Sequence, residues 1–451
     1  MSRPTVSLWN DTVPVSVSPR PALDGDTVVD VAIVGAGLTG IWTAYYLLKR
    51  DPSLRVALLE KHTVGFGASG RNGGWASALF PQSTASLIER YGVDRARGLR
   101  DAMVESIGEI GRVVEAEGID CDFARVGTLI YARTALQEKM LRAEVAEAQA
   151  LGIDHLEWVE GDHVRASNAR GATFTHDCAR VHPAKLVQGL ARVIEARGAT
   201  IYDNTEVLSW VSGRVTTARG AVTAKYIINA TEGYGASIKQ THRRILPLYS
   251  LMIATAPLPD SVWDDIGLQH GHTFSDGRNL IIYGQRTADN RFAFGGRGAR
   301  YHLGSTIKPE YDRSDTVFGH LERTLSEMFP QAGKLDITHR WGGPLGVPRD
   351  WHAHVALDPA TGIGSAGGYV GDGLTTTNLA GRTLADLITG TDSHLTTLPW
   401  VGHRSPDWEF EPLRFIGANA GLVGMTAADA EEAATGRPSI IAKLLAPLTG
   451  H

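Results

Sequence analysis

The chain has 451 residues, of which 43% are hydrophobic and 21% are charged, a composition typical of a soluble globular protein with two or three domains. Its formal net charge of −5 gives no basis for nucleic-acid binding, and the lack of an apolar run of about 18 residues excludes a membrane span. The two cysteines, Cys121 and Cys178, form no CxxC pair, which excludes a disulfide framework, a zinc ribbon and a dithiol redox centre.

The first predicted elements form a βαβ unit. After a Pro-rich N-terminal segment, "TVVDVAIVG" at 27–35 is a short apolar run that ends in Gly, as a buried parallel strand does. A helix with apolar residues at helical spacing follows at 38–51, and "LRVALLE" at 54–60 is a second buried strand. Strand, turn, helix and strand in this order are typical of a nucleotide-binding sheet.

Three glycines, Gly35, Gly37 and Gly40, form a GxGxxG motif between that strand and that helix. The first permits a tight turn, the second lets a pyrophosphate approach the backbone, and the third lets the helix pack on the strand. The helix N-terminus offers free N–H groups and a partial positive charge to phosphates. Glu60 ends the next strand twenty residues after Gly40, where a carboxylate accepts the ribose hydroxyls. The spacing predicts a dinucleotide site.

A second glycine-rich loop, "VGFGASGRNGGW" at 64–75, follows Glu60 after a few residues. A nicotinamide enzyme has no evident need for it, whereas a flavin nucleotide continues past the pyrophosphate through a ribityl chain to a three-ring head. The N–H groups of 68–70 and the Ser69 hydroxyl would hold the second phosphate, and Arg71 would neutralise it. Residues 72–74 would lie against the flavin edge, where side chains would clash. The alternative is a surface loop whose Arg faces water.

The rest of the chain alternates between α/β segments and a more antiparallel middle. Helices are predicted at 84–118, 134–152, 315–330 and near the C-terminus, a helix followed by a strand pair at 182–210, an apolar strand at 224–231, antiparallel strands at 244–296, and a strand, glycine-rich turn and long helix at 362–390. His352 and His354 form an HxH pair with no visible third ligand, so no metal site is predicted. The order suggests a dinucleotide domain in separated pieces with a second domain inserted.

Several of these segments resemble one family. "VAIVGAGLTG", "LLEK", "GFGASGRNGGW", "HPAKLVQGLA", "NATEGY" and "GYVGDGLTTTNLAGRTLADLI" are similar to the FAD-dependent oxidoreductases of the D-amino-acid oxidase superfamily. The GASGRNGG form is most similar to the gamma-glutamylputrescine oxidase group of amine oxidases. The resemblance runs from about residue 28 to 387 and is specific for FAD and for the fold, and much less so for the substrate.

The resemblance implies an α/β fold with a Rossmann-like FAD-binding domain of the glutathione-reductase type and an inserted α+β substrate domain built on an antiparallel sheet. The FAD-binding domain is expected at 1–85, 155–240 and 340–451, and the substrate-binding domain at 86–154 and 241–339.

The resemblance also places the cofactor along the chain. The strand with 205–207 meets adenine, 229–231 flanks the pyrophosphate, and the late turn at 368–375 carries the pyrimidine end of the flavin on a helix N-terminus, where an anion is stabilised. The residues assigned to FAD are Gly35, Gly37, Leu38, Thr39, Gly40, Glu60, Lys61, Gly67, Ala68, Ser69, Arg71, Asn72, Gly73, Gly74, Val207, Ala230, Thr231, Gly343, Gly368, Tyr369, Gly371, Asp372, Gly373, Leu374 and Thr375.

Two departures from the family stand out. Members with covalent flavin use Cys or His near the ring, whereas this loop has Arg71 and Asn72, and "RWGGPLG" at 340–346 has no Cys, so non-covalent FAD is expected. Relatives often carry His where Asp372 stands. An acid beside the flavin disfavours the reduced anion unless it is paired or protonated. Binding of a cationic substrate and a carboxylate that points away both remain open.

The expected reaction is oxidation of a primary or secondary amine or amino acid, by hydride transfer to flavin N5 and hydrolysis of the imine, with electrons passing to O2 or another acceptor. Tyr249, Tyr283, Arg286 and Arg297 are the catalytic candidates, with Arg297 placed where relatives have a basic residue that helps oxygen react. For Tyr249 a half-buried sheet aromatic is an equal alternative, and for Arg286 a surface ion pair is.

Two other functions remain open: a flavin enzyme that oxidises or hydroxylates a non-amine metabolite, and a non-catalytic FAD-binding protein. No second dinucleotide motif for NADPH is visible, which argues against the hydroxylase. The N-terminus lacks the basic-then-apolar layout of a signal peptide, so a cytoplasmic protein is expected. Its partners are expected to be a small-molecule amine and O2, without nucleic acid or membrane.

Overall fold

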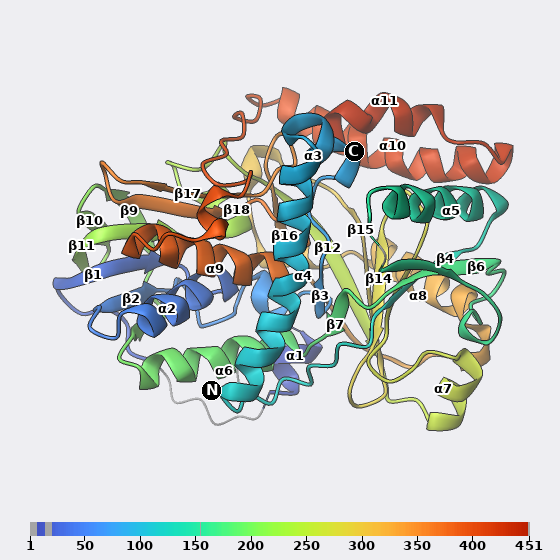
Figure 1. Cartoon of the computed structure of the whole chain (residues 1–451), viewed down its shortest axis with the longest axis horizontal. Coiled ribbons are helices and arrows are strands. Elements are labelled where there is room, and N and C mark those ends of the chain that lie inside the picture. Colours follow the sequence, from blue (N-terminus) through green and yellow to red (C-terminus); the bar gives the residue numbers. More distant parts are fainter. Residues whose placement is uncertain (1–6, 14–19, 154, 450–451) are drawn as a thin grey trace.

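A computed structural model describes residues 7–13, 20–153 and 155–449 of the chain. Its described residues form two large sheets and a short two-stranded one. Figure 1 shows the first sheet with helices α2, α6 and α9 on the left, the second sheet with α5, α7 and α8 on the right, and the long helix α4 between them. The helices are α1 (Leu8–Asp11), α2 (Leu38–Arg50), α3 (Thr84–Tyr91), α4 (Val93–Ala116), α5 (Ala135–Ala150), α6 (Pro183–Ala196), α7 (Asp260–Ile266), α8 (Asp315–Met328), α9 (Gly373–Thr389), α10 (Leu413–Thr435) and α11 (Ile440–Thr449).

The first sheet is the predicted nucleotide-binding sheet. Its order is β17-β18-β11-β1-β2-β8, with the antiparallel pair β9 and β10 attached to β11. The central strands β11, β1, β2 and β8 run parallel, as βαβ connections require. Its strands are β1 (Thr27–Val34), β2 (Val56–Leu59), β8 (Thr200–Tyr202), β9 (Val207–Val211), β10 (Arg214–Thr217), β11 (Gly220–Asn229), β17 (His354–Asp358) and β18 (Ile363–Gly367).

Helices pack closely on this sheet and build the larger core. Helix α2 packs on α9 and on α6, and α9 packs on α4. The approach of α2 to α9 is so close that a Cβ at Gly381 would lie 2.7 Å from the backbone of Trp42. Trp42 is fully buried in this core with Tyr45 and Leu384. The interlocked helices hold the N-terminus of α9 close to the first glycine turn, although more than 330 residues separate the two in the sequence.

The second sheet has the order β16-β12-β15-β14-β13-β4-β6-β5 and is mostly antiparallel. Helices α7 and α8 cover its apolar face, where Phe274, Phe292 and Phe329 pack together. Its strands are β4 (Thr128–Ala132), β5 (Leu156–Val159), β6 (Gly171–Thr175), β12 (Leu246–Thr255), β13 (Thr273–Asp276), β14 (Ile282–Arg286), β15 (Phe292–Ala299) and β16 (Ile337–Val347). The two-stranded sheet pairs β3 (Trp75–Ser77) with β7 (Cys178–Arg180).

Three strands that lie in the segments expected for the FAD-binding domain pair within the second sheet. Strands β5 and β6 fall within 155–240, and most of β16 falls within 340–451, yet all three belong to the second sheet. The reason for β16 is its long antiparallel pairing with β12, from Leu246 opposite Val347 to Thr255 opposite Ile337. The chain therefore crosses between the two sheets more often than the predicted boundaries allow.

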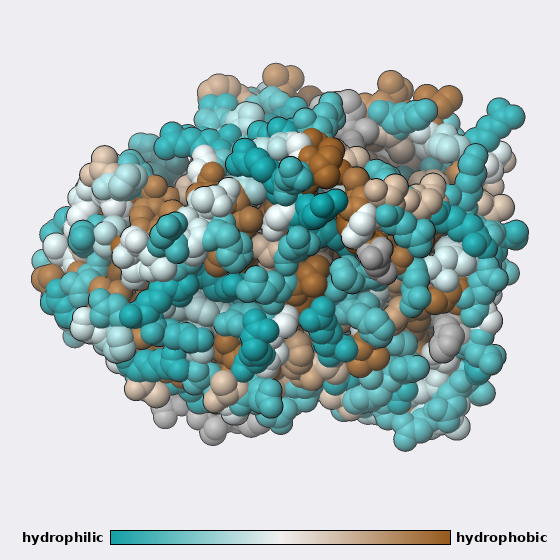
Figure 2. All heavy atoms as spheres, in the orientation of Figure 1, coloured by the Kyte–Doolittle hydropathy of each residue, from teal (hydrophilic) through white to brown (hydrophobic). Residues whose placement is uncertain are grey.

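Helices α10 and α11 pack on each other at the C-terminal end. They carry exposed apolar side chains, among them Leu413, Ile416, Val423, Ile440 and Leu444. Brown spheres at the upper edge of Figure 2 lie over these helices on a face that is otherwise largely hydrophilic. Within the described part of the chain, no helix combines the length and apolar character needed to cross a membrane.

Candidate active site

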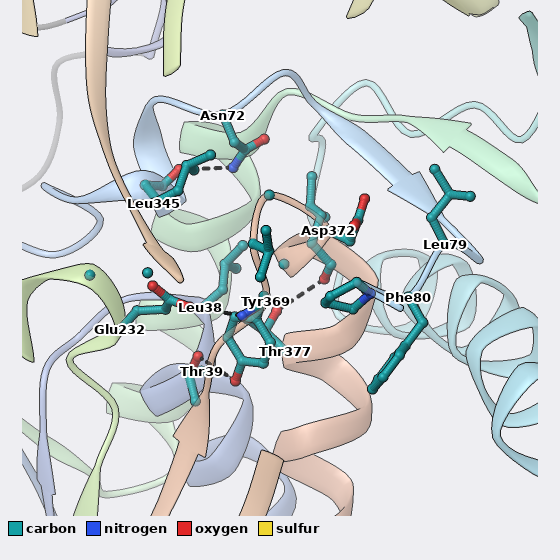
Figure 3. Close-up of a pocket in the computed structure, with 18 of the residues that line it drawn as sticks. Leu38, Thr39, Asn72, Leu79, Phe80, Glu232, Leu345, Tyr369, Asp372 and Thr377 are labelled. Atoms are coloured by element: carbon teal, nitrogen blue, oxygen red, sulfur yellow. Dashed lines mark hydrogen bonds between the residues drawn. The ribbon is translucent and has the colours of Figure 1, made fainter. Parts of the chain in front are cut away.

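A cavity of about 920 Å³ runs from the carboxyl end of the first sheet to the second sheet. Its wall includes both glycine-rich loops, the residues after β11, the late turn before α9, and side chains of β12, β14 and β15. Figure 3 shows Leu38, Thr39 and Glu232 on one side of this cavity and Asp372, Leu79 and Phe80 on the other. Ligands of open α/β sheets bind at this end of the strands.

The first glycine turn has the geometry that its motif predicts. Gly35 has a φ of +105°, and a Cβ there would lie 2.8 Å from the carbonyl oxygen of Ala230. A Cβ at Gly40 would lie 2.2 Å from the carbonyl oxygen of Gly35, so only glycine lets α2 approach the turn. Gly37 is the N-cap of α2 and provides no side-chain cap. The N-terminal amides of α2 therefore face the cavity uncapped by its N-cap residue, in the arrangement that binds phosphate.

Glu60 follows β2 and lines the cavity. Its carboxylate accepts hydrogen bonds of 2.9 Å from the backbone N–H of Ala36 and from that of His62. Burial raises the pKa of Glu60 despite these two bonds. The two amides fix the carboxylate beside the first turn, where the predicted ribose contact requires it.

The second glycine loop packs directly on the first. The amide of Leu38 donates a 2.8 Å hydrogen bond to Ser69 Oγ, and Ser69 lies in the short 3₁₀ turn η1 (Ala68–Gly70). Gly73 lies so close to the ring of Tyr283 that a Cβ would come within 2.7 Å of it. Gly74 instead packs against Gln285 and the carbonyl of Val181, and does not line the cavity. Gly74 therefore allows the close contact between the second glycine loop and the second sheet.

Arg71 lines the cavity but is already paired with protein groups. Its guanidinium donates hydrogen bonds to the carbonyls of Phe66 and Gly342 and forms an ion pair of 2.5 Å with Asp312. The side chain is 3% exposed. The structure therefore uses Arg71 to join the second loop to the second sheet, and the charge that was expected to neutralise a phosphate is balanced by Asp312.

The late glycine turn lies between β18 and α9. Gly368 and Gly371 have φ values of +76° and +112°, and Val370 between them has +52°. The Tyr369 hydroxyl lies 3.1 Å from Thr39 Oγ1, which ties this turn to α2. Asp372 is the N-cap residue of α9, but its side chain accepts no capping hydrogen bond. The turn thus presents the amides at the N-terminus of α9 toward the cavity.

Glu232 is a residue of the site that sequence reasoning missed. It follows β11 with a φ of +46°, and its Oε1 accepts hydrogen bonds from the amides of Gly368 at 2.9 Å and Tyr369 at 3.0 Å. Backbone N–H groups of Gly346 and Gly233 also donate to it. Burial nevertheless raises the pKa of Glu232 to about 7. The acid directly after "NAT" was the only sequence signal for these hydrogen bonds between Glu232 and the late turn.

Two of the four catalytic candidates meet at the far end of the cavity. The Tyr283 hydroxyl lies 2.8 Å from Ser250 Oγ, and the Arg297 Nη2 donates a 2.8 Å hydrogen bond to the carbonyl of Val370. Both residues line the cavity together with Asp372. Burial raises the pKa of Asp372 to about 6, although Arg297 opposes the rise. Burial likewise raises the pKa of Tyr283.

The other two candidates lie outside the cavity lining. On β12 the side chain of Ser250 faces the cavity, so Tyr249, one residue earlier, faces the opposite side of the sheet, against His302 and Tyr311. Arg286 hydrogen-bonds to Asn290 and to the carbonyl of Leu268 and lies over the ring of Trp263. The sequence placed Tyr249 on the correct strand and Arg286 just after a predicted strand, and it did not determine the face of either residue.

Most residues that the sequence assigned to the cofactor line one continuous cavity. Those that do line it are Gly35, Gly37, Leu38, Thr39, Glu60, Lys61, Gly67, Ala68, Ser69, Arg71, Asn72, Gly73, Val207, Ala230, Thr231, Gly343, Tyr369, Gly371, Asp372, Gly373 and Leu374. Gly40, Gly74, Gly368 and Thr375 support this wall from behind. The continuity of the cavity, the N-termini of α2 and α9 at its wall and the glycines that cannot carry a Cβ together fit FAD.

The parallel sheet and this elongated cradle define a dinucleotide-binding flavoprotein. Comparison with known proteins gives the family: the FAD dependent oxidoreductase family (DAO) matches residues 30–387. The chain belongs to this family and binds FAD as its cofactor.

Two curated relatives are similar over most of the chain. Gamma-glutamylputrescine oxidoreductase of Escherichia coli is 32% identical over 384 residues, covering 83% of this chain and 86% of the relative. The probable oxidoreductase OrdL of Haemophilus influenzae is 30% identical over 385 residues, covering 81% and 84%. Among solved structures, glycine oxidase from Geobacillus kaustophilus superposes with a TM-score of 0.69 at 21% identity, covering 84% of this chain and 99% of that one. The structural likeness shows the shared fold.

Proposed function

We propose that the protein oxidises a primary or secondary amine or an amino acid, using FAD and passing the electrons to O2. The observation that carries the proposal is the continuity of the cavity, which extends from the Glu60 end of the dinucleotide cradle to Tyr283, Arg297 and Asp372. The names of the relatives support an amine or an amino acid as substrate. A chain that only stored FAD would have no need of a further chamber lined with polar groups beyond the cofactor.

The chain's own residues would position the cofactor in three places. Glu60 would accept the ribose hydroxyls, and the N-terminal amides of α2 that follow Leu38 would bind the pyrophosphate. The N-terminus of α9 would face the pyrimidine edge. When bound there, FAD supplies the two-electron acceptor for a hydride from the carbon next to nitrogen. Cys121 and Cys178 lie outside the cavity lining, which supports non-covalent attachment.

The residues at the far end would orient the substrate. Tyr283 and Gly73 are in close contact, so the tyrosine ring forms a rigid wall against the second glycine loop. Phe80 and Trp351 line the cavity and would exclude water from the reacting carbon. Arg297 would place a positive charge where oxygen gains electrons, which favours anionic oxygen species.

We extend the proposal to domains and location. The first sheet with α2, α6 and α9 would form the FAD-binding domain, and the second sheet with α7 and α8 the substrate-binding domain. Both cysteines are buried and free, which supports residence in the reducing cytoplasm.

One experiment tests the function. The purified yellow protein is mixed under nitrogen with a panel of amines and amino acids while the absorbance of oxidised flavin is recorded. Loss of that absorbance with at least one member, followed by peroxide formation when air is readmitted, is the expected result. If no member bleaches the flavin, amine oxidation is the wrong assignment. Acid precipitation should release all of the flavin, and colour retained in the pellet would contradict non-covalent binding.

A further inference from the structure

The side chain of Asp372 does not perform the role that its position suggests. It is the N-cap residue of α9, where an aspartate ordinarily accepts a hydrogen bond from an amide two or three residues later. Here that bond is missing, and the side chain lines the cavity. Among the described residues, its carboxylate forms no hydrogen bond and no ion pair. The helix amides stay available for the cofactor, and the negative charge is directed into the substrate end.

This charge lies in surroundings that make an unpaired anion costly. Phe80, Trp351 and Leu345 line the same cavity. Arg297 is the charged group that acts most strongly on Asp372, but its Nη2 donates to the carbonyl of Val370 and the two side chains form no ion pair in the described structure. Asp372 is half-buried, and a carboxylate in a largely apolar cavity without a direct partner is stabilised when a cation arrives. The Asp372 carboxylate therefore lacks a direct cationic partner, and the Arg297 guanidinium acts on it only through space.

Two of the cations that line the cavity already have acidic partners. Lys61 pairs with Glu206 at 2.7 Å, and Arg71 pairs with Asp312. They add little attraction for an anionic ligand, because their charge is balanced locally. Asp372, in contrast, has no such partner at the end where Tyr283 and Ser250 place their hydroxyl groups.

We propose that Asp372 receives the ammonium group of the substrate and accepts a proton from it, so that the enzyme selects amines that enter as organic cations. In this step one N–H bond breaks, an O–H bond forms on the carboxylate, and the electron pair stays on nitrogen as the lone pair that amine oxidation requires. The inference rests on the proposed function, since it assigns the substrate class of that same site.

The test uses three probes that share a tert-butyl group, with the FAD-loaded protein. tert-Butylammonium is a cation whose carbon bears no hydrogen next to nitrogen, so it cannot be oxidised; tert-butanol is its neutral counterpart and pivalate its anionic one. Each is titrated while the visible spectrum of the oxidised flavin is recorded. The cation should bind at least about tenfold more tightly than the alcohol, as one desolvated charge pair provides. Tighter binding of pivalate would overturn the proposal in favour of a carboxylate site at Arg297.

Two variants test whether the preference for the cation depends on Asp372. In Asp372→Asn the preference for tert-butylammonium over tert-butanol should disappear, while the melting temperature stays close to the parent value, because the side chain makes no capping hydrogen bond to lose. The affinities are compared for the FAD-loaded fraction of each protein. Glu147→Gln is the matched control, since it removes one negative charge from an exposed position of the same cavity wall. It should change the affinity by less than about threefold. An equal loss in both variants would show a general charge effect and contradict the proposal.

The outcomes distinguish a failure of the proposed role of Asp372 from a failure of the proposed amine oxidation. If amines bleach the flavin but tert-butylammonium binds no better than tert-butanol, the role of Asp372 is refuted and the function stands. If tert-butylammonium binding depends on Asp372 but no amine bleaches the flavin, amine oxidation is refuted and the cation site stands. A reducing amine found in the panel should also lose at least about tenfold in its anaerobic reduction efficiency in Asp372→Asn.

Discussion

The amide of Leu38 donates a 2.8 Å hydrogen bond to the hydroxyl of Ser69, and this bond joins the first residue of α2 to the second glycine loop. A Cβ at Gly37 would lie 2.9 Å from the same hydroxyl, so the two loops are in contact along this edge. The pair places both glycine-rich segments in one unit, and any ligand phosphate must fit against both.

Ser69→Ala tests this unit. The substitution leaves the Leu38 amide without its acceptor and removes a hydroxyl from the cavity wall. Loss of one buried hydrogen bond costs about 1 kcal/mol, so the dissociation constant of FAD should rise about fivefold. Recovery of flavin fluorescence on dilution measures it. Ser326→Ala on the exposed face of α8 is the control and should leave the constant unchanged.

Gly40→Ala should damage both the cofactor site and the fold. The new methyl group would lie 2.2 Å from the carbonyl oxygen of Gly35, and backbone on both sides cannot move apart without opening the turn. Overpacking of this kind costs about 1–3 kcal/mol. The melting temperature and the flavin content of the purified protein should both fall.

The same chemical change in α10 should have the opposite effect. Gly417 is exposed, and a Cβ there meets no atom within 4 Å. Because alanine is the better helix former, Gly417→Ala should stabilise the protein by up to about 1 kcal/mol and keep its flavin. Similar melting temperatures for the two variants would refute the close contact at Gly40.

Glu232 should make stability depend on pH. Burial raises its pKa from an ordinary 4.5 to about 7, so between these values the folded protein holds a proton that the unfolded chain has released. The free energy of unfolding contributed by this group therefore falls as pH rises through that window, by on the order of 3 kcal/mol at most. Denaturant unfolding at pH 5 and pH 8, with FAD in excess, measures the slope.

Glu232→Gln removes the titrating group and should flatten that slope. Its carboxamide offers one acceptor oxygen in place of two to the backbone N–H groups of Gly233, Gly346, Gly368 and Tyr369, so the variant should be less stable at pH 5. An unchanged slope would locate the pH dependence elsewhere.

Arg297 should govern the reaction with oxygen. In Arg297→Met the reduced protein should react with O2 at least about tenfold more slowly, because the positive charge that favours anionic oxygen species is gone. Arg297→Lys retains the charge and should keep most of the rate, although the hydrogen bond to Val370 would be weakened. Stopped-flow mixing of photoreduced protein with aerated buffer gives the rate. Equal losses in both variants would indicate a structural effect on the late turn.

The cofactor cradle was predictable because the local backbone geometry determines which residue types can occupy it. Gly35, Gly37 and Gly40 fix a turn whatever the remainder of the fold does, and Glu60 follows at a fixed strand length. The substrate end was harder. Strand periodicity placed Tyr249 on β12. Alternation alone does not determine which face of the strand lines the cavity, and in the structure Ser250 is on that face.

Contacts between distant segments were beyond sequence reasoning. Glu232 binds amides at 346, 368 and 369, and no spacing in the chain joins these positions. Arg71 was read as a phosphate partner because its loop is next to the cradle, whereas Asp312, which balances its charge, lies 241 residues further on. Pairing of β16 with β12 moved a strand from the expected domain for the same reason.

The path of the chain has a consequence for biosynthesis. The first phosphate turn is at residues 35–40, and the turn that faces the other end of the cofactor is at 368–375, so the emerging polypeptide lacks one side of the cradle until more than four fifths of it has been translated. Contacts of such sequence separation form late. Ribosome-bound intermediates should therefore be colourless and protease-sensitive, and cells starved of riboflavin should accumulate the full-length polypeptide in a degradable form.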